Sequence, residues 1–207
     1  MNKHEKDRIE GLFHFERNLW SAGKHYIAGI DEAGRGPLAG PVVAAAVIFS
    51  QELFIPQVND SKLLSPQQRE IIYKSIIAAA LDVGIGQASP VEIDSMNILN
   101  ASLLAMRRAV DDLVIRPDHL LIDGNQMISD CDIPQDSLIK GDSRSFSIAA
   151  ASIIAKVTRD RIMVDYHHRH PEYGFDKHKG YPVKAHRESI KTHGYCDIHR
   201  RSFKVTL

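Results

Sequence analysis

The sequence predicts an α/β fold, in which a mixed sheet of five strands is flanked by helices and followed by a small basic helical region. Two strands separated by a Gly- and Pro-rich turn occupy residues 25–49. Short apolar strands and amphipathic helices then alternate, and a long Ala- and Ile-rich helix is expected over residues 146–166. With 207 residues, 43% of them hydrophobic, the chain is long enough to bury one core.

The opening strand pair carries two adjacent acids at its bend. An apolar segment ends at Asp31 and Glu32, a turn follows over residues 33–41, and an eight-residue apolar run extends from Val42 to Phe49. Side chains on a strand alternate between its two faces. We therefore expect Asp31 and Glu32 to serve one site only if the chain is already turning at Glu32.

Two helices in the middle of the chain begin with the same signal. Ser-Pro-x-Gln/Glu at residues 65–68 and 89–92 places Ser at the N-cap, Pro at the first helical position and Gln or Glu at N3. The first helix is predicted over residues 66–80. The second region, residues 93–114, is predicted as two helical segments that meet near Asn97, and residues 82–88 between the helices are predicted as a strand.

Two further short strands are each expected to end in a carboxylate. Residues 119–123 end at Asp123 before Gly124, and residues 138–142 end at Asp142. Strands of this kind between helices indicate a sheet with a parallel portion, in which ligands gather at strand ends.

Composition limits where the protein acts. The run Val42–Phe49 is far shorter than the roughly 20 residues of a spanning helix, and the N-terminus is charged, so we expect a cytoplasmic protein with no membrane partner. Cys131 and Cys196 are expected to be reduced thiols.

Charge is unevenly distributed along the chain. The formal net charge is zero, yet residues 140–207 hold 14 Lys and Arg against 7 Asp and Glu, and seven of the eleven histidines. A phosphate backbone would be drawn to that end and a cation to the acidic remainder. A solvated basic face without a partner is the alternative.

Four acids stand at the ends of the expected elements: Asp31, Glu32, Asp123 and Asp142. Each alone has a structural explanation, as a turn residue or as a charge at a helix N-terminus. Together they would repel one another by about 4 kcal/mol per close pair near a protein surface. Such a cluster requires a cation or protons, and all-oxygen ligands suit Mg²⁺ or Mn²⁺.

Six motifs in order resemble bacterial ribonuclease HII, the type 2 ribonuclease H. They cover roughly residues 25–190 and comprise residues 29–36, 60–62, 122–125, 140–142, 150–160 and 178–182. The resemblance implies a ribonuclease H-like sheet, with three antiparallel strands first and two parallel strands after. It also implies Asp31, Glu32, Asp123 and Asp142 as catalytic metal ligands.

The resemblance further implies how a substrate is held. Gly34-Arg35-Gly36 resembles the loop that reads the ribose 2′-hydroxyl at an RNA-to-DNA junction, and glycines do allow backbone groups to approach a sugar. Tyr181 resembles the aromatic residue that packs on the sugar of the following deoxynucleotide.

Basic residues around these motifs are candidate phosphate contacts. The set is Lys62, Arg144, Lys156, Arg159, Lys177, Lys179, Lys184 and Arg187. The histidines at 167, 168, 170 and 199, with Cys196, suggest zinc but complete no four-ligand set, and we interpret them as surface and backbone contacts.

The resemblance implies an endonuclease that hydrolyses the RNA strand of RNA–DNA hybrids and cuts 5′ of ribonucleotides embedded in duplex DNA, leaving 3′-hydroxyl and 5′-phosphate ends. The expected cofactor is Mn²⁺ or Mg²⁺ and the expected state a monomer. Two alternatives remain: a non-catalytic nucleic-acid-binding protein of this fold, or a DNA-acting nuclease of it. We divide the chain into a lead-in (1–24), a catalytic domain (25–170) and a basic helical region (171–207).

Overall fold

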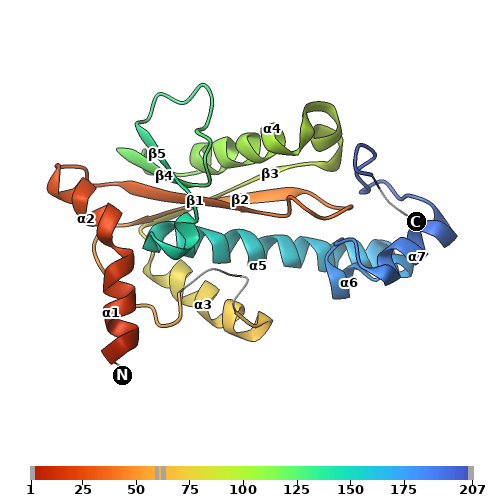
Figure 1. Cartoon of the computed structure of the whole chain (residues 1–207), viewed down its shortest axis with the longest axis horizontal. Helices are drawn as coiled ribbons and strands as arrows, with labels where there is room; N and C mark the ends of the chain where they lie inside the picture. The colour runs from red at the N-terminus through yellow and green to blue at the C-terminus, as the bar shows by residue number, and fades with distance from the viewer. Residues whose placement is uncertain (1–2, 59–60, 62–63, 205–207) are drawn as a thin grey trace.

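The computed structural model describes residues 3–58, 61 and 64–204, and it has a five-stranded mixed sheet at its centre (Figure 1). The strands lie in the order β3-β2-β1-β4-β5. The pairs β1–β2 and β2–β3 are antiparallel, whereas β1–β4 and β4–β5 are parallel, which confirms the expected topology. The strand bounds are Ile27–Ala33 (β1), Val42–Phe49 (β2), Asp82–Ala88 (β3), His119–Asp123 (β4) and Gln135–Leu138 (β5).

Helices cover both faces of the sheet. Figure 1 shows α4 on one face and the long α5 on the other, with α3 beyond α5 and the short C-terminal helices at one end. The helix bounds are Lys3–Leu12 (α1), His14–Ser21 (α2), Pro66–Ala79 (α3), Pro90–Asp111 (α4), Phe146–Arg169 (α5), Phe175–His178 (α6) and Lys184–His193 (α7), with 3₁₀ turns at Gly141–Ser143 (η2) and Pro171–Tyr173 (η3).

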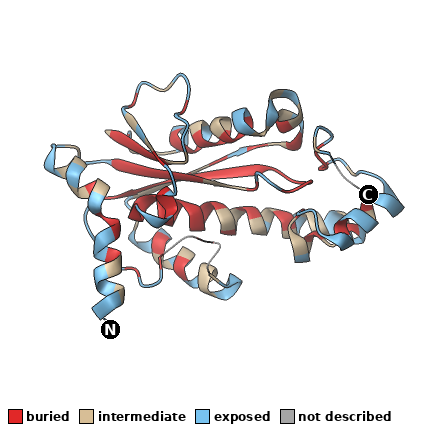
Figure 2. Ribbon diagram, viewed as in Figure 1, coloured by how far each residue is buried: buried red, intermediate tan, exposed pale blue. Residues whose placement is uncertain are grey.

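The central strands are buried on both sides. Every residue of β2 is buried, because α4 and α5 cover its two faces (Figure 2). Glycines allow the helices to approach closely: a Cβ on Gly86 would lie 2.1 Å from the carbonyl of Ala105 in α4, and one on Gly29 would lie 2.2 Å from the backbone of Ser147 in α5. The start of α5 is thereby pressed against β1, next to the acids of that strand.

The predicted helix signals are confirmed. Ser65 and Ser89 each form a reciprocal capping box, with Gln68 and Glu92 respectively. Asn97 has φ 70° and ψ 165° inside α4, and its side chain accepts hydrogen bonds from the N–H groups of Leu99 and Asn100. It therefore breaks the helix and caps its second segment.

The fifth strand differs from the prediction. It runs from Gln135 to Leu138, whereas the sequence predicted a strand from Leu138 to Asp142. Three of its four residues are polar, as suits a sheet edge with one neighbour, so hydrophobicity does not reveal it. Lys140 then turns the chain with φ 56°, and Asp142 lies in η2.

The N-terminal helices join the core. Ile9, Leu12 and Phe13 are buried in one cluster with Phe49 and Phe146, and the Phe13 and Phe146 ring centroids lie 4.4 Å apart. The division of the chain at residues 24 and 170 stays a prediction. Cys131 and Cys196 are free thiols, as expected. No helix in the described part of the chain has the length and apolarity to cross a membrane.

Candidate active site

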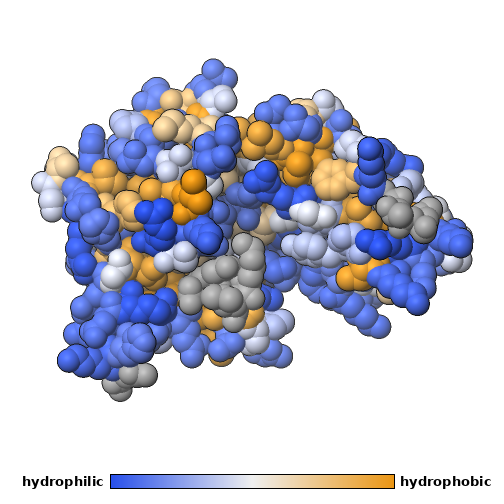
Figure 3. Space-filling model, in the orientation of Figure 1, coloured by the Kyte–Doolittle hydropathy of each residue, from blue (hydrophilic) through white to orange (hydrophobic). Residues whose placement is uncertain are grey.

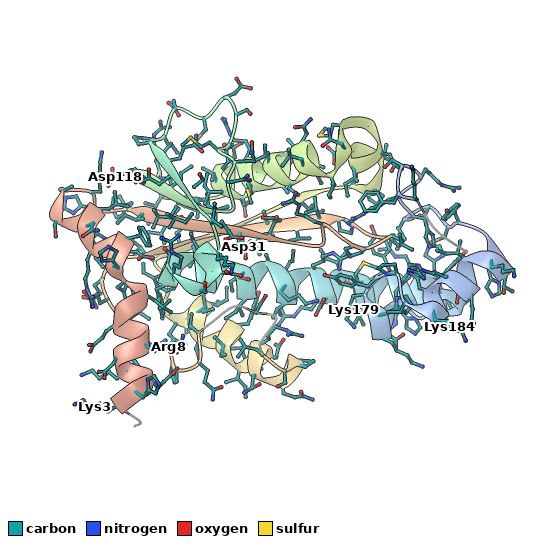
Figure 4. The ribbon with its side chains drawn as sticks, viewed as in Figure 1. Lys3, Arg8, Asp31, Asp118, Lys179 and Lys184 are labelled. Carbon is teal, nitrogen blue, oxygen red and sulfur yellow. The ribbon has the colours of Figure 1, made fainter. Side chains whose placement is uncertain are left out.

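Parallel pairing of β1 with β4 brings two distant acids together. Ile30 is paired with Ile122, so Asp31 and Asp123 follow side by side at the same edge of the sheet. Figure 4 places Asp31 near the middle of the molecule, between the sheet and α5. In the next strand Leu138 is paired with Asp123, and the chain then turns into η2, which holds Asp142.

The charges of these acids act on one another. Burial raises the pKa of Asp31 well above its usual value, and the charges of Glu32 and then Asp123 add to the effect. Burial also raises the pKa of Glu32; Asp123 contributes, and the Arg35 guanidinium opposes it. The carboxyls of β1 and β4 therefore share one crowded and largely dehydrated site.

The bend after the first two acids comes later than predicted. β1 continues to Ala33, which is paired with Val43, and the left-handed turn comes at Gly34, whose φ is 102°. Both Asp31 and Glu32 still lie close enough to Asp123 for its charge to affect the pKa of each. A bend at Glu32 itself is therefore not needed for the two acids to act at one site.

Asp142 is tied to the same site through its backbone. The N–H of Gly141 donates to Oδ1 of Asp123 at 2.7 Å, and Asp142 is 7% exposed. Asp31, Glu32 and Asp123 thus meet at the carboxyl ends of β1 and β4, and the backbone next to Asp142, in the turn after β5, is hydrogen-bonded to Asp123. A small cavity of about 30 Å³ is lined by Glu32, Asp123 and Asn125.

The donor chemistry fits a hard divalent cation. The four acids supply carboxylate oxygens, which Mg²⁺ and Mn²⁺ prefer. Arg35 Nη1 lies 3.3 Å from Glu32 Oε1, and half of the Arg35 side chain is exposed. Its charge offsets one carboxylate only in part, so a bound cation would relieve the remaining repulsion.

Ser152 of α5 holds Asp31 from the opposite side. Its hydroxyl is hydrogen-bonded to the Asp31 side chain and lies 3.0 Å from the hydroxyl of Ser61. All three residues are buried. Ser152 was given no role from the sequence, because a serine among alanines on a buried helix does not indicate which strand it faces.

The Gly34-Arg35-Gly36 turn lies beside Tyr181. A Cβ on Gly36 would have the Tyr181 ring as its nearest neighbour, at 3.9 Å, and Tyr181 is 39% exposed. Leu38 N–H donates to the carbonyl of Gly180 at 2.8 Å, which ties the two segments together. The structure therefore brings together a backbone-lined loop and an aromatic face.

Comparisons with known proteins agree with this geometry. A sequence model described as ribonuclease HII matches residues 28–206. The chain belongs to the ribonuclease HII family. A curated ribonuclease HII from Syntrophus aciditrophicus is 55% identical over 195 residues, covering 94% of this chain and 92% of that protein. The ribonuclease HII of Geobacillus kaustophilus is 52% identical, covering 96% and 75%.

Solved structures confirm the ribonuclease H-like fold. The ribonuclease H2 of Pyrococcus horikoshii superposes with a TM-score of 0.69 at 31% identity, covering 86% of this chain and 94% of that one. A structure of ribonuclease HII with PCNA from Archaeoglobus fulgidus gives a TM-score of 0.73 at 26% identity, covering 88% and 96%. The family match also includes the C-terminal residues, beyond the motifs noted in the sequence.

Other members of the expected substrate-binding set lie in varied surroundings. Arg144 is exposed; it donates to the carbonyl of Ile139 at 3.1 Å and lies 5.1 Å from the Phe15 ring centroid. Lys62 lies outside the described residues. Arg159 was expected to contact phosphate, but this is wrong: it is fully buried and donates to the backbone carbonyls of Ala39, Pro41 and Lys179.

A larger cavity lies apart from the acids. It measures about 640 Å³ and is lined by α3, α5 and α6, including Lys156, Lys179 and Tyr181. Hydrophilic side chains cover most of the α6–α7 end on the face shown in Figure 3, and Figure 4 places Lys179 and Lys184 there. A duplex lies across an open surface, so the site is located by its chemistry and not by cavity size.

The cysteine and histidine residues near the C-terminus do not complete a four-ligand zinc site. His170, Cys196 and Asp197 have ligand atoms within 4.8 Å of one another, and within the described ranges no fourth His, Cys or acid joins them. His199 makes a backbone contact, as expected, because it accepts from the N–H of Cys196, but it is buried and not at the surface, and it lies against His186.

Proposed function

We propose that this chain is a metal-dependent endonuclease that hydrolyses the RNA strand of RNA–DNA hybrids and cuts 5′ of ribonucleotides embedded in duplex DNA. The ends left are 3′-hydroxyl and 5′-phosphate. The observation that supports the proposal is that Asp31, Glu32 and Asp123 lie at one edge of the sheet, with the backbone next to Asp142 hydrogen-bonded to Asp123, in a chain of the ribonuclease HII family.

The four carboxylates would hold Mg²⁺ or Mn²⁺. Their chemistry there would be to activate a water and to stabilise the leaving oxygen of a phosphodiester. Asp31 is held by Ser152, and Asp123 by the N–H of Gly141, so both carboxylates are oriented before an ion arrives. No side chain has to form a covalent intermediate.

The loop and the tyrosine select the sugar. Glycines at 34 and 36 leave backbone groups free to approach a ribose, and the 2′-hydroxyl both donates and accepts hydrogen bonds. Tyr181 lies next to Gly36 and offers its ring to the following deoxyribose. Lysines near Tyr181, such as Lys156 with Nζ 5.7 Å from the ring centroid, meet the phosphate backbone.

The remaining assignments belong to the same proposal. Lys62 and Arg144 contact the nucleic acid, and the protein acts as a cytoplasmic monomer. The A. fulgidus relative was solved in complex with PCNA, and that contact is a property of that protein.

A nicking assay on three end-labelled duplexes of one sequence tests the function. One contains a single ribonucleotide, one is a full RNA–DNA hybrid, and one is all DNA. With Mg²⁺ or Mn²⁺ we expect cleavage of the first two, with the cut 5′ of the lone ribonucleotide, and no cleavage after chelation.

The same assay separates the alternatives. A non-catalytic binding protein would bind all three duplexes without cutting any, and a DNA-acting nuclease would cut the all-DNA duplex equally well. Either result would overturn the proposal. The Asp123→Asn variant is the matched control, since it removes one metal ligand and retains the size of the side chain.

A further inference from the structure

The C-terminal tail pairs with the loop that contains Gly34 and Gly36. We call residues 34–41 the ribose loop. Ala39 and His199 form an isolated antiparallel bridge, the N–H of Gly40 donates to Ile198, and the N–H of Arg200 donates to Leu38. Residues 198–200 therefore act as an added strand along the ribose loop, although they lie far from it in the sequence.

Arg200 spans the ribose loop with its guanidinium. Nη2 donates to the carbonyl of Gly34 at 2.6 Å, Nη1 to Arg35 at 2.9 Å, and Nε to Gly40 at 3.0 Å. The side chain is 0% exposed, and all three acceptors are backbone carbonyls. Burial lowers its pKa to about 9. Burying a cation whose only hydrogen-bond acceptors are carbonyls costs free energy. The arginine at this position is therefore better explained by a specific role than by its contribution to stability.

Arg159 fixes the other side of the same loop. Its guanidinium donates to Pro41 at 2.9 Å, to Ala39 at 3.1 Å and to Lys179 at 3.1 Å, next to the turn that carries Tyr181. Two buried arginines from different elements thus hydrogen-bond to main-chain oxygens of the ribose loop and its neighbouring turn, and Arg159 also lies 5.9 Å from the Tyr181 ring centroid.

This arrangement needs the shape of arginine. A guanidinium is planar, with donors fixed in a fork, whereas a lysine ammonium is a single point that cannot reach three separated carbonyls in one plane. The three carbonyls belong to the two ends of the loop, around Gly36. Arg200 therefore sets the distance between those ends and, with it, the path of the backbone that faces the substrate.

The tail is anchored so that Arg200 enters at a fixed place. Asp94 in α4 accepts hydrogen bonds from the N–H groups of Arg201 and Ser202 at 2.8 and 2.9 Å, and from the Ser202 hydroxyl at 2.6 Å. The residues directly after Arg200 are thereby held against the first segment of α4, before the break at Asn97, by an acid other than the four at the candidate site.

We propose that Arg200 is a positioning residue for sugar selection: it holds the ribose loop in the geometry that recognises the 2′-hydroxyl. The inference rests on the proposed function, because it assumes that the loop reads ribose. It assigns a role to the C-terminal tail, which the sequence motifs left without one.

The test compares Arg200→Lys and Arg200→Ala with Arg201→Ala. Arg201 is the adjacent, exposed arginine: its guanidinium lies 4.8 Å from the Tyr195 ring centroid, whereas the bonds to Gly34, Arg35 and Gly40 come from Arg200. Three quantities are measured: kcat and KM on the single-ribonucleotide duplex, Ki of the matching all-DNA duplex as competitor, and Mn²⁺ affinity of the free protein.

For Arg200→Lys we expect kcat/KM to fall about 10- to 100-fold, because a displacement of about 1 Å in a group that positions the substrate can reduce the rate by that much. The ratio of Ki to KM should fall toward one, while Mn²⁺ affinity stays at the native value. A purely structural loss would reduce the active fraction and leave both the Ki/KM ratio and the affinity of the folded molecules unchanged. Arg201→Ala should match the native protein in all three quantities.

Asp94→Ala provides a second variant in case both Arg200 variants fail to fold. It removes the anchor of residues 201–202 but keeps the Arg200 side chain. We therefore expect the Ki/KM ratio to fall in the same direction, but less than in the Arg200 variants. A native ratio in every folded variant of Arg200 and Asp94 would overturn the inference. If the native protein cuts the all-DNA duplex as well as the single-ribonucleotide duplex, the proposed function fails, and this inference fails with it.

Discussion

The backbone N–H of Gly141 donates a 2.7 Å hydrogen bond to Oδ1 of Asp123. It connects the acid at the end of β4 with the turn that carries Asp142, eighteen residues further along the chain. A Cβ on Gly141 would lie 2.7 Å from Ile148 Cδ1 and 3.3 Å from Asp123 Oδ1, so a larger residue there would press on the side chain of Asp123 and require Ile148 to move. The position of one proposed metal ligand therefore depends on the backbone next to another.

Asp123→Asn should abolish turnover and leave the fold intact. The asparagine oxygen can still accept from Gly141, but the charge that attracts a divalent cation is lost. We expect kcat with Mg²⁺ to fall at least about a hundredfold, with hybrid binding retained. Single-turnover rates and a binding titration measure the two effects.

Asp118→Asn is the control for that substitution. Asp118 accepts from the N–H groups of His25 and Tyr26, and Figure 4 labels it at the left end of the molecule, apart from Asp31 near the middle. Its activity should equal that of the native protein. Near-native turnover of Asp123→Asn would exclude Asp123 as a ligand.

Alanine at the two glycines of the ribose loop should have different effects. Gly34→Ala forces a side chain into φ 102°, with its Cβ 2.1 Å from Arg159 Nε, so we expect a loss of stability of about 2 kcal/mol or more. A Cβ on Gly36 meets nothing closer than 3.9 Å, so Gly36→Ala should keep native stability.

Gly36→Ala is therefore the cleaner probe of function. Its added methyl group lies between the loop and the Tyr181 ring, where a sugar would enter. We expect KM for the single-ribonucleotide duplex to rise about tenfold, which corresponds to the loss of about 1.4 kcal/mol of binding free energy. Native melting temperature and native kinetics together would contradict a role for the loop in sugar selection.

Tyr181 should act through its ring and not through its hydroxyl. Tyr181→Phe keeps the aromatic face and should retain near-native activity, whereas Tyr181→Ala should weaken substrate binding about tenfold, within the range for lost stacking contacts. The half-exposed Tyr195 provides the control, since Tyr195→Ala should have no such effect. Steady-state KM values distinguish these outcomes, and equal losses in Phe and Ala would point to the hydroxyl instead.

The pair Glu92–Arg108 gives a pH-dependent contribution to stability. Hydrogen bonds from Arg108 and from Ser89 lower the pKa of Glu92 from 4.5 to about 2. Because the folded value lies below the unfolded one, the contribution is fully present above pH 4.5 and is lost as the pH falls toward 2. Glu92→Gln keeps an N3 acceptor for the capping box but loses the charge.

We therefore expect Glu92→Gln to be less stable than the native protein by about 0.5–1 kcal/mol at neutral pH, as for partly exposed ion pairs. The difference should shrink as the solution is acidified below the unfolded pKa. Urea unfolding at several pH values measures it. A difference that grows on acidification would contradict the assignment.

Local signals predicted the fold well where one residue determines the conformation. The serine-proline capping boxes and the break at Asn97 appear as expected, and β4 ends at Asp123 as predicted, whereas β1 continues past Asp31 and Glu32 to Ala33. The edge strand β5 was misplaced because its polar side chains give no hydrophobic pattern. The position of β5 is set by its parallel pairing with β4, which local sequence patterns do not show.

Long-range polar contacts were beyond the sequence patterns. Glu16 of α2 is 2% exposed, and its Oε1 accepts from the hydroxyls of Ser145 and Ser147 and from the N–H of Ser147 at the start of α5. A carboxylate there also favours the positive end of the helix. Buried polar residues of this kind resemble surface charges in a sequence until their partners are known.

The most direct test of the whole account is an anomalous-scattering map from crystals of the native protein grown with Mn²⁺. The account predicts manganese between Asp31 and Asp123, with Glu32 and Asp142 around it, and loss of the peak in Asp123→Asn. Manganese bound elsewhere while these four carboxylates remain empty in the native protein would contradict it.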